Sequence, residues 1–235
     1  MSYAYEAGVA AHAPALERAA FIRRTYGHLA AAILAFIGIE FALLRLTPGI
    51  ENLVHGMLSV SWLLILGGFM VVSFIANYWA RSGASPTMQY LGLALYVVAQ
   101  AVIFLPLLYI ADSSPLFREQ HVIRTAGILT LTVFGGLTAT VFITRKDFSW
   151  MGPILCVGGF LALGLIVAAV LFGFGLGLIF CFAMVALISG YILYYTSNVL
   201  HHYRTDQHVA AALALFSSIA TLFWYILQIV MMSRD

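Results

Sequence analysis

The sequence predicts an all-α membrane protein built as a bundle of seven transmembrane helices. Of its 235 residues, 63% are hydrophobic and only 9% are charged, and the mean hydropathy is +1.01. Soluble domains carry about a quarter charged residues, so a water-soluble core could not hide this much apolar surface. The apolar residues also fall into long runs, each with roughly the 20 residues that cross a hydrocarbon layer as a helix.

Short segments that contain Pro, Gly or charged residues separate the expected spans. The spans are residues 27–46, 57–79, 88–110, 122–143, 150–171, 176–197 and 208–231. A transmembrane β-barrel would need short segments of alternating polarity, which are not seen in this sequence. The break at residues 173–175 is the shortest, and it leaves an alternative in which the fifth and sixth runs form a re-entrant hairpin.

Residues 1–26 are expected to form a cytoplasmic segment before the first span. The apolar run begins only at about residue 27 and is long enough to span, which is unlike a cleaved signal peptide. Lys and Arg in short loops set orientation, and their excess predicts a cytoplasmic N-terminus and a C-terminus on the opposite side. The N-terminal side would hold Arg18, Arg23, Arg24, Arg81, Arg145, Lys146 and Arg204, and the other side Arg45, Arg118, Arg124 and Arg234.

The composition and motifs exclude several classes of function. A net charge of +2, scattered along the chain, does not suit a nucleic-acid-binding protein. Cys156 and Cys181 both lie inside apolar runs and imply no disulfide framework. No Ser-His-Asp set, HExxH motif, phosphate-binding loop or dinucleotide fingerprint occurs, so we expect neither an enzyme nor a bound cofactor.

The last two spans each carry a stripe of small or polar residues. Tyr191, Tyr195 and Asn198 lie at i, i+4 and i+7 in the sixth span. In lipid, polar groups turn toward protein or a watery cavity, so the two stripes are expected to face each other. The stripe of the seventh span consists of Ala211, Ala214, Ser218, Thr221, Tyr225 and Gln228.

The hairpin at residues 191–224 resembles the C-terminal hairpin of the Bax inhibitor-1 family, the transmembrane Bax-inhibitor-motif proteins, which include bacterial YccA-like members. The loop TRKDFS at residues 144–149 is similar to the lysine-aspartate-phenylalanine connection of that family. The two aspartates that the family carries in this hairpin correspond to Tyr195 and Ser218. The resemblance therefore covers the sequence pattern around these two positions, whereas the aspartate pair itself is absent.

The resemblance implies a bundle with the last helix at its centre, in a bacterial plasma (inner) membrane. It also implies a pH-dependent leak of cations, especially calcium, which the family's two aspartates are thought to control. Neither a phenol nor a hydroxyl is an anion at neutral pH, and calcium prefers carboxylate ligands. We therefore expect a cation leak protein with altered pH and calcium gating, and protons or calcium as the ions. The alternative is a membrane interaction protein that modulates a membrane-bound protease or another stress-response partner.

Six residues are candidates for the pathway or its gate: Tyr191, Tyr195, Ser218, Thr221, Gln100 and Glu40. Glu40 is the only acid well inside a span, and it either binds a proton or cation or reaches toward Arg45 or the headgroups. Gln100 shares a face with Gly92 and Tyr96, at i, i+4 and i+8. That face either lines a pore or packs against another helix through the glycine.

Two loops carry further polar residues, Asp147 and three histidines, whose roles can be predicted. Asp147, in the loop before the fifth span, is expected to cap the next helix. His201, His202 and His208 surround the last turn and either are solvated at the interface or bind a metal. Adjacent His201 and His202 point to different faces of a helix, which disfavours a metal site.

Overall fold

The computed structural model describes residues 8–82 and 85–233, and within them the chain is α-helical, with one isolated β-bridge. Seven of the helices are long and apolar enough to cross a membrane. In chain order the elements are α1 (Ala15–Leu46), α2 (Ile50–Ser59), α3 (Trp62–Ala80), α4 (Pro86–Ser113), α5 (Pro115–Glu119), α6 (Val122–Thr144), the 3-10 turn η1 (Ser149–Met151), α7 (Gly152–Phe172), α8 (Gly177–His201) and α9 (His208–Met232).

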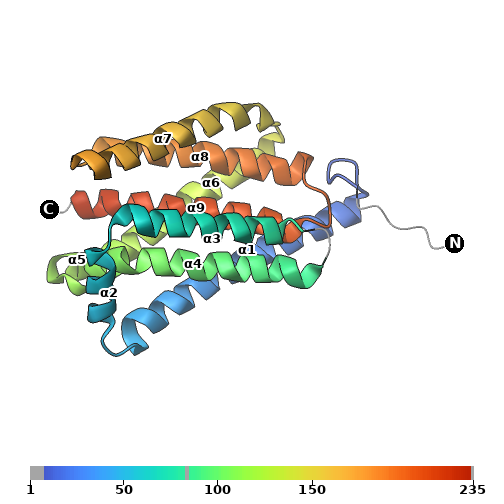
Figure 1. The fold of residues 1–235 in the computed structure, drawn as a ribbon. Helices are drawn as coiled ribbons and strands as arrows, with labels where there is room; N and C mark the ends of the chain where they lie inside the picture. Colours follow the sequence, from blue (N-terminus) through green and yellow to red (C-terminus); the bar gives the residue numbers. More distant parts are fainter. Residues whose placement is uncertain (1–7, 83–84, 234–235) are drawn as a thin grey trace.

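Several helix ends differ from the spans expected from hydropathy. The first helix begins at Ala15, so part of the expected cytoplasmic segment continues the helix; residues 1–7 and Arg234 lie outside the described residues. The second span begins at Trp62 because Ile50–Ser59 form the separate helix α2, which lies across one end of the bundle (Figure 1). Apolar composition cannot distinguish a short interfacial helix from the first turns of a span.

The fifth and sixth runs form two separate helices, and the re-entrant alternative is not what the structure shows. Both α7 and α8 are long enough to span. The turn between them uses Gly173 and Gly177 with φ of 71° and 66°. Glycine adopts this left-handed conformation without steric penalty, and it commonly ends helices in this way.

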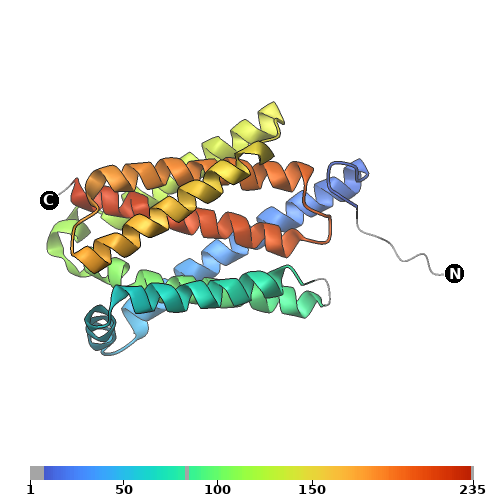
Figure 2. The same ribbon diagram turned by 45° about the horizontal axis from the view of Figure 1, so that its top comes forward.

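The last helix forms the centre of the bundle. It packs against α1, α3, α4, α6 and α8, and Figures 1 and 2 show α9, in red, between α8 on one side and α3 with α4 on the other. In the structure, 78% of the most apolar stretch of α9 is buried, against 11% for the most apolar stretch of Ser149–Phe172. The structure is thus the seven-helix bundle with a central last helix that the resemblance implied.

Small residues allow the central helices to approach closely. The first turns of α9 contain Ala210, Ala211 and Ala212, which are at most 5% exposed. At Gly92 of α4, a Cβ atom would lie 2.6 Å from the carbonyl oxygen of Ala76 in α3. Close backbone contact of this kind is how helices associate in lipid, where no hydrophobic effect drives them together.

Polar contacts join the segments at the N-terminal end of the bundle. Val9 forms an antiparallel bridge with Arg204, and the Ala10 N–H donates to the Tyr203 carbonyl at 2.9 Å. The Thr205 hydroxyl donates to the Glu17 carboxylate at 2.8 Å. The segment before α1 is therefore fastened to the loop between α8 and α9.

Candidate permeation site

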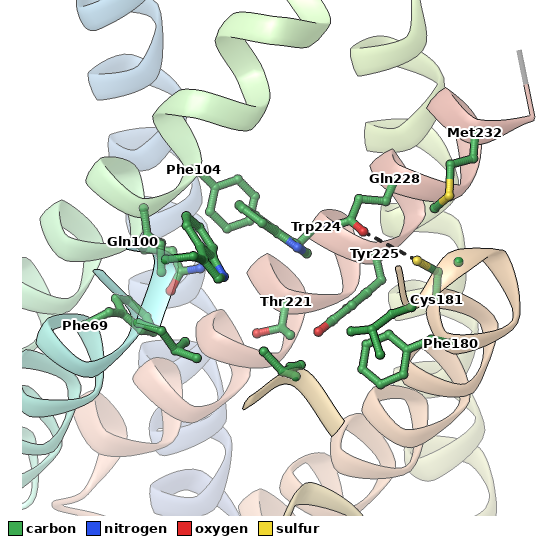
Figure 3. A pocket seen from close by; sticks show the side chains of 16 residues that line it. Phe69, Gln100, Phe104, Phe180, Cys181, Thr221, Trp224, Tyr225, Gln228 and Met232 are labelled. Atoms are coloured by element: carbon green, nitrogen blue, oxygen red, sulfur yellow. Dashed lines mark hydrogen bonds between the residues drawn. The ribbon is translucent and has the colours of Figure 1, made fainter. Parts of the chain in front are cut away.

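Two cavities lie against α9, and the residues that line them lie toward opposite ends of the bundle. The first, of about 430 Å³, lies between α3, α4, α7, α8 and α9 at the end where α9 finishes, and we call it the C-side cavity (Figure 3). Aromatic rings of Trp62, Phe104 and Trp224 form much of its wall. Its polar lining consists of Gln100, Cys181, Thr221, Tyr225 and Gln228.

The second cavity, of about 600 Å³, lies between α3, α4 and α9 toward the end where α3 finishes. We call it the N-side cavity. Its polar lining consists of Ser73, Asn77, Tyr78, Arg81, Tyr96 and Ser217. Ser217 is nine residues into α9, so this cavity reaches a depth of about 14 Å along the helix axis.

The two cavities meet at Phe69, which lines both of them. Beside it, the hydroxyls of Tyr96 and Ser217 form a hydrogen bond of 2.7 Å, and the Phe69 and Tyr96 rings are 5.9 Å apart. Gln100 lies one helical turn after Tyr96, and Thr221 one turn after Ser217. We call the line of polar side chains that joins the cavities the polar seam; it consists of Asn77, Tyr96, Gln100, Ser217, Thr221 and Gln228.

Hydrogen bonding along the polar seam is incomplete. The Thr221 hydroxyl donates to the Ser217 carbonyl at 2.8 Å, and Gln228 Oε1 accepts from the Cys181 thiol at 3.5 Å (Figure 3). Gln100 is only 4% exposed, and its Oε1 has no hydrogen-bond partner. A buried acceptor without a partner is costly unless a water or an ion can reach it, and Gln100 lines the C-side cavity.

The charges around the seam are few and positive. No Asp or Glu occurs among the described residues that line either cavity, and Arg81 is the charged residue of the N-side cavity. Arg81 also acts electrostatically on Tyr203, in the loop between α8 and α9. Burial raises the pKa of the Tyr203 phenol above its usual value, and the positive charge of Arg81 partly opposes that rise.

Comparison with known proteins decides the family. The family described as "Inhibitor of apoptosis-promoting Bax1" matches residues 18–235. The chain belongs to the Bax inhibitor-1 family. It is 31% identical to a BI1-like protein of Arabidopsis thaliana, over 89% of this chain and 79% of that protein. It is 28% identical to Bax inhibitor 1 of Schizosaccharomyces pombe, over 93% of this chain and 78% of the other.

A bacterial relative supports the same assignment. An uncharacterized protein of Pseudomonas aeruginosa is 28% identical, over 88% of this chain and 87% of its own length. No solved structure matches the chain. These comparisons establish an integral membrane protein of a family that is generally not enzymatic.

The structure brings together two of the six candidates from the sequence. Gln100 of α4 and Thr221 of α9 line the C-side cavity of this Bax inhibitor-1 family protein (Figure 3). Ser218 is buried, but its hydroxyl donates to the Ala214 carbonyl of its own helix at 3.0 Å. Ser218 is therefore beside the polar seam in sequence without lining either cavity.

The tyrosine pair of α8 lies apart from the seam. Tyr191 donates its hydroxyl to the Leu155 carbonyl of α7 at 2.8 Å, and the Tyr195 ring stacks on Tyr191 at 5.8 Å. In the described part of the chain, no hydrogen bond joins Tyr195 to Ser218, the positions that correspond to the family's aspartates. The two stripes were expected to face each other, but no hydrogen bond joins Tyr195 and Ser218 across the described helices α8 and α9.

Glu40 lies in a different part of the bundle, between α1, α4, α6 and α9. The alternative in which it reaches toward Arg45 is not formed, because Arg45 pairs with Asp112 of α4 at 2.7 Å. Neither Glu40 oxygen has a hydrogen-bond partner. Glu40 is therefore not part of the polar seam.

Three residues of the site were not among the candidates from the sequence: Phe69, Asn77 and Ser217. A signal for Ser217 was present, because Ser217, Thr221, Trp224 and Gln228 recur at helical spacing on one face of α9. The stripe expected from the small and polar residues of α9 contained Ser218, which also corresponds to a family aspartate, and it left out Ser217. The polar residues of α3 gave no comparable stripe.

The histidines and Asp147 make contacts of a structural kind. His202 pairs with Asp147 at 3.0 Å, and the His208 ring lies 5.0 Å from the His28 ring. Within residues 8–82 and 85–233, no three His, Cys, Asp or Glu side chains gather as they would around a metal. The backbone N–H of Ser149, donating at 2.8 Å, together with His202 lowers the pKa of Asp147 to about 2. Asp147 thus holds the turn between α6 and α7, but it is not the helix cap expected from the sequence, because no side-chain hydrogen bond caps η1 or α7.

Proposed function

We propose that this protein is a gated leak pathway for small monovalent cations, including protons, along the polar seam. The observation that supports it most is the meeting of the two cavities at a single constriction, Phe69 with the Tyr96–Ser217 hydrogen bond. The lining residues of the two cavities lie toward different ends of the bundle. Displacement of one ring and one hydrogen bond would join them.

The lining chemistry favours monovalent cations over calcium. Amide and hydroxyl oxygens of Gln100, Thr221 and Gln228 can replace part of a hydration shell, and the faces of Trp62 and Trp224 attract cations. Calcium sites usually include carboxylates, and none is present among the described lining residues. The proposed pathway therefore differs from a carboxylate-controlled calcium leak.

Reconstituted liposomes test this proposal. Purified protein in vesicles that contain a potassium-sensitive or a pH-sensitive dye is expected to give flux above that of empty vesicles. Replacing Phe69→Ala together with Tyr96→Phe should raise the flux several-fold, because both elements of the constriction are removed. The matched control is Phe160→Ala with Tyr191→Phe, which changes a lipid-facing ring and a hydrogen bond outside the polar seam.

Two results would overturn the pathway. One is flux equal to that of empty vesicles for both wild type and the Phe69→Ala, Tyr96→Phe variant. The other is an equal increase in the control variant, which would indicate general loosening of the bundle. Silence in vesicles combined with specific co-purification of a membrane protease would favour the alternative function, modulation of that protease.

We also propose that pH and calcium control is reduced in this protein. Tyr195 and Ser218 stand where the family's aspartates are expected, and a phenol ordinarily ionises only near pH 10. Flux should therefore vary little between about pH 6 and pH 8 once His201, His202 and His208 are replaced. The double substitution Tyr195→Asp, Ser218→Asp in that background should introduce pH dependence, because it restores carboxylates at the positions that correspond to the family's aspartate pair, and carboxylates that share a site raise one another's pKa. A steep pH response of the histidine-free protein would contradict the proposal.

For orientation, we propose a cytoplasmic N-terminus in a bacterial inner membrane. The charge bias of the loops and the seven spans support this arrangement. A reporter that is active only in the cytoplasm should work when fused before Met1 and fail when fused after Asp235. The opposite pattern would reverse the orientation, and activity of both fusions would contradict an odd number of crossings.

A further inference from the structure

Glu40 is a buried carboxyl without a partner. It is 5% exposed, it lies in α1 about 9 Å from the end of that helix, and neither oxygen has a hydrogen-bond partner. An isolated carboxyl in this position is unfavourable, and acids within membrane spans usually mark a functional group. The polar seam does not use Glu40, so its presence needs a separate reason.

Glu40 lines an apolar cavity of about 370 Å³ between α1, α4, α6 and α9. The other polar side chain of the lining, Thr130, already donates its hydroxyl to the Ala126 carbonyl at 2.8 Å. The remaining lining residues are apolar, and they include Phe36, Ile37, Phe41, Gly127 and Leu131. We call this space the Glu40 cavity.

Aromatic rings separate the Glu40 cavity from the polar seam. Phe36 contacts Phe104 and Phe216, with ring centroids 5.2 Å and 6.1 Å apart, and Phe104 stacks on Phe223 at 5.9 Å. Phe104 lines the C-side cavity on the far side of this cluster. The two spaces are therefore distinct, and a ligand of one need not enter the other.

One side of the Glu40 cavity faces the membrane. Ile37 and Phe41 of α1 and Leu131 of α6 are 55%, 60% and 57% exposed, and all three line the cavity. Residues with these side chains within membrane spans contact lipid tails. A hydrophobic molecule could reach the cavity from the bilayer without crossing water.

The charged residues of the neighbouring cavity do not pair with Glu40. Phe41, Leu44 and Ile123 also line a neighbouring cavity, which contains Arg45, Asp112, Arg118, His121 and Arg124. Asp112 in that cavity pairs with Arg45 at 2.7 Å and with Arg118 at 3.7 Å. No cationic side chain lines the Glu40 cavity in the described part of the chain.

We propose that the Glu40 cavity binds a lipophilic amine that enters from the bilayer. Its ammonium group pairs with the Glu40 carboxylate, and its hydrocarbon chain fills the apolar space beside Phe36, Phe41 and Leu131. A charged partner with N–H donors satisfies the carboxyl, which a neutral hydrocarbon cannot do. The cavity volume is within the range of about 300–1,000 Å³ that holds small ligands.

Octylamine is a suitable probe, with octan-1-ol and octanoate as matched ligands of equal chain length. In mild detergent, octylamine is expected to raise the melting temperature of the wild-type protein, because a ligand that binds only the folded state stabilises it. Octan-1-ol should give less than about a third of that rise, and octanoate none. Native mass spectrometry should show one octylamine bound per chain.

Two pairs of variants locate the site. Glu40→Gln should abolish the octylamine-specific rise, whereas Glu51→Gln, which changes an exposed acid of α2, should keep it. Gly127→Leu should also abolish the rise, because Gly127 lines the cavity and a Cβ there has no neighbour within 4 Å. Gly135→Leu is its control on the same helix, also with open space around the Cβ.

The proposal is overturned if octan-1-ol matches octylamine, because the carboxyl would then play no part. It is also overturned if Glu40→Gln and Gly127→Leu, both folded by their own melting curves, bind octylamine as well as the wild type. None of these results depends on ion flux, so the polar seam and the Glu40 cavity are tested separately.

Discussion

In soluble proteins the most apolar helices lie at the centre, and the helices α7 and α9 of this protein show the opposite arrangement. α7 is the more apolar helix, yet it lies at the edge of the bundle and most of its surface is exposed. α9 carries Ser217, Ser218, Thr221 and Gln228, yet it is surrounded on all sides. In lipid the solvent is as apolar as leucine, so small and polar residues, rather than hydrophobic ones, determine which helix is central.

The largest loss of stability is expected when a glycine in a close helix contact is enlarged, compared with a glycine that has open space around it. Gly92→Leu should reduce the free energy of unfolding by at least about 3 kcal/mol, because the added atoms collide with the α3 backbone at Ala76 and Ala80. Gly164→Leu on α7 should change it little, since a Cβ there has no neighbour within 4 Å. Thermal unfolding in detergent measures both. Equal losses would show that α7 is packed as tightly as the centre.

The next prediction compares the loss of stability at two phenylalanines, Phe216, which is 1% exposed, and Phe160, which is 70% exposed. Phe216→Ala leaves a cavity among the central rings, and in lipid the packing loss dominates the transfer term. We expect about 1–3 kcal/mol, below the 3–5 kcal/mol of soluble cores. Phe160→Ala should stay within about 0.5 kcal/mol. A larger loss at Phe160 would mean that α7 contacts a partner in the membrane.

A smaller effect is expected from single hydrogen bonds, and it should be similar in both regions. Tyr96→Phe removes the hydroxyl bonded to Ser217, and Tyr191→Phe removes the one that joins α8 to α7. Interhelical hydrogen bonds in membranes average about 0.6 kcal/mol, so both variants should lose about that amount. A loss several times larger at Tyr96 alone would indicate that the constriction also organises the surrounding helices.

The smallest effect concerns Asp147 at the N-terminal end. Its pKa of about 2 lies below the ordinary value of 3.8, so its contribution to stability is present above about pH 4 and is lost as the pH falls toward 2. Asp147→Asn should destabilise the protein at pH 6 by no more than the roughly 0.2–1 kcal/mol typical of exposed pairs. The difference from wild type should shrink between pH 4 and pH 2. A difference that does not change with pH would assign the effect to the altered hydrogen bonds of the turn and not to the charge of Asp147.

The fold could be predicted from the sequence because composition and run length report directly on the surrounding lipid. The ends of helices were less predictable, as α2 shows. The polar stripe expected on α9 contained Thr221, which lines the C-side cavity, and Ser218, which lines neither cavity, and it left out Ser217, which lines the N-side cavity. A helix enclosed on all sides has no single inward face, so periodicity alone cannot assign its residues to particular neighbours.

The cavities themselves could not be predicted. They depend on where rings from separate helices fail to fill space, as Phe69, Trp62 and Trp224 do around the C-side cavity. The isolated position of Glu40 was visible in the sequence as a lone acid. Whether Arg45 would reach it was decided by Asp112, which lies far along the chain in α4.

The central position of α9 has a consequence for how the protein is made. Synthesis runs from the N-terminus, so the helix that fills the middle leaves the ribosome after the helices that surround it. Until then, α1, α3, α4, α6 and α8 lack the helix that all five of them contact. A chain that stops before His208 would lose the axis of the bundle rather than its edge.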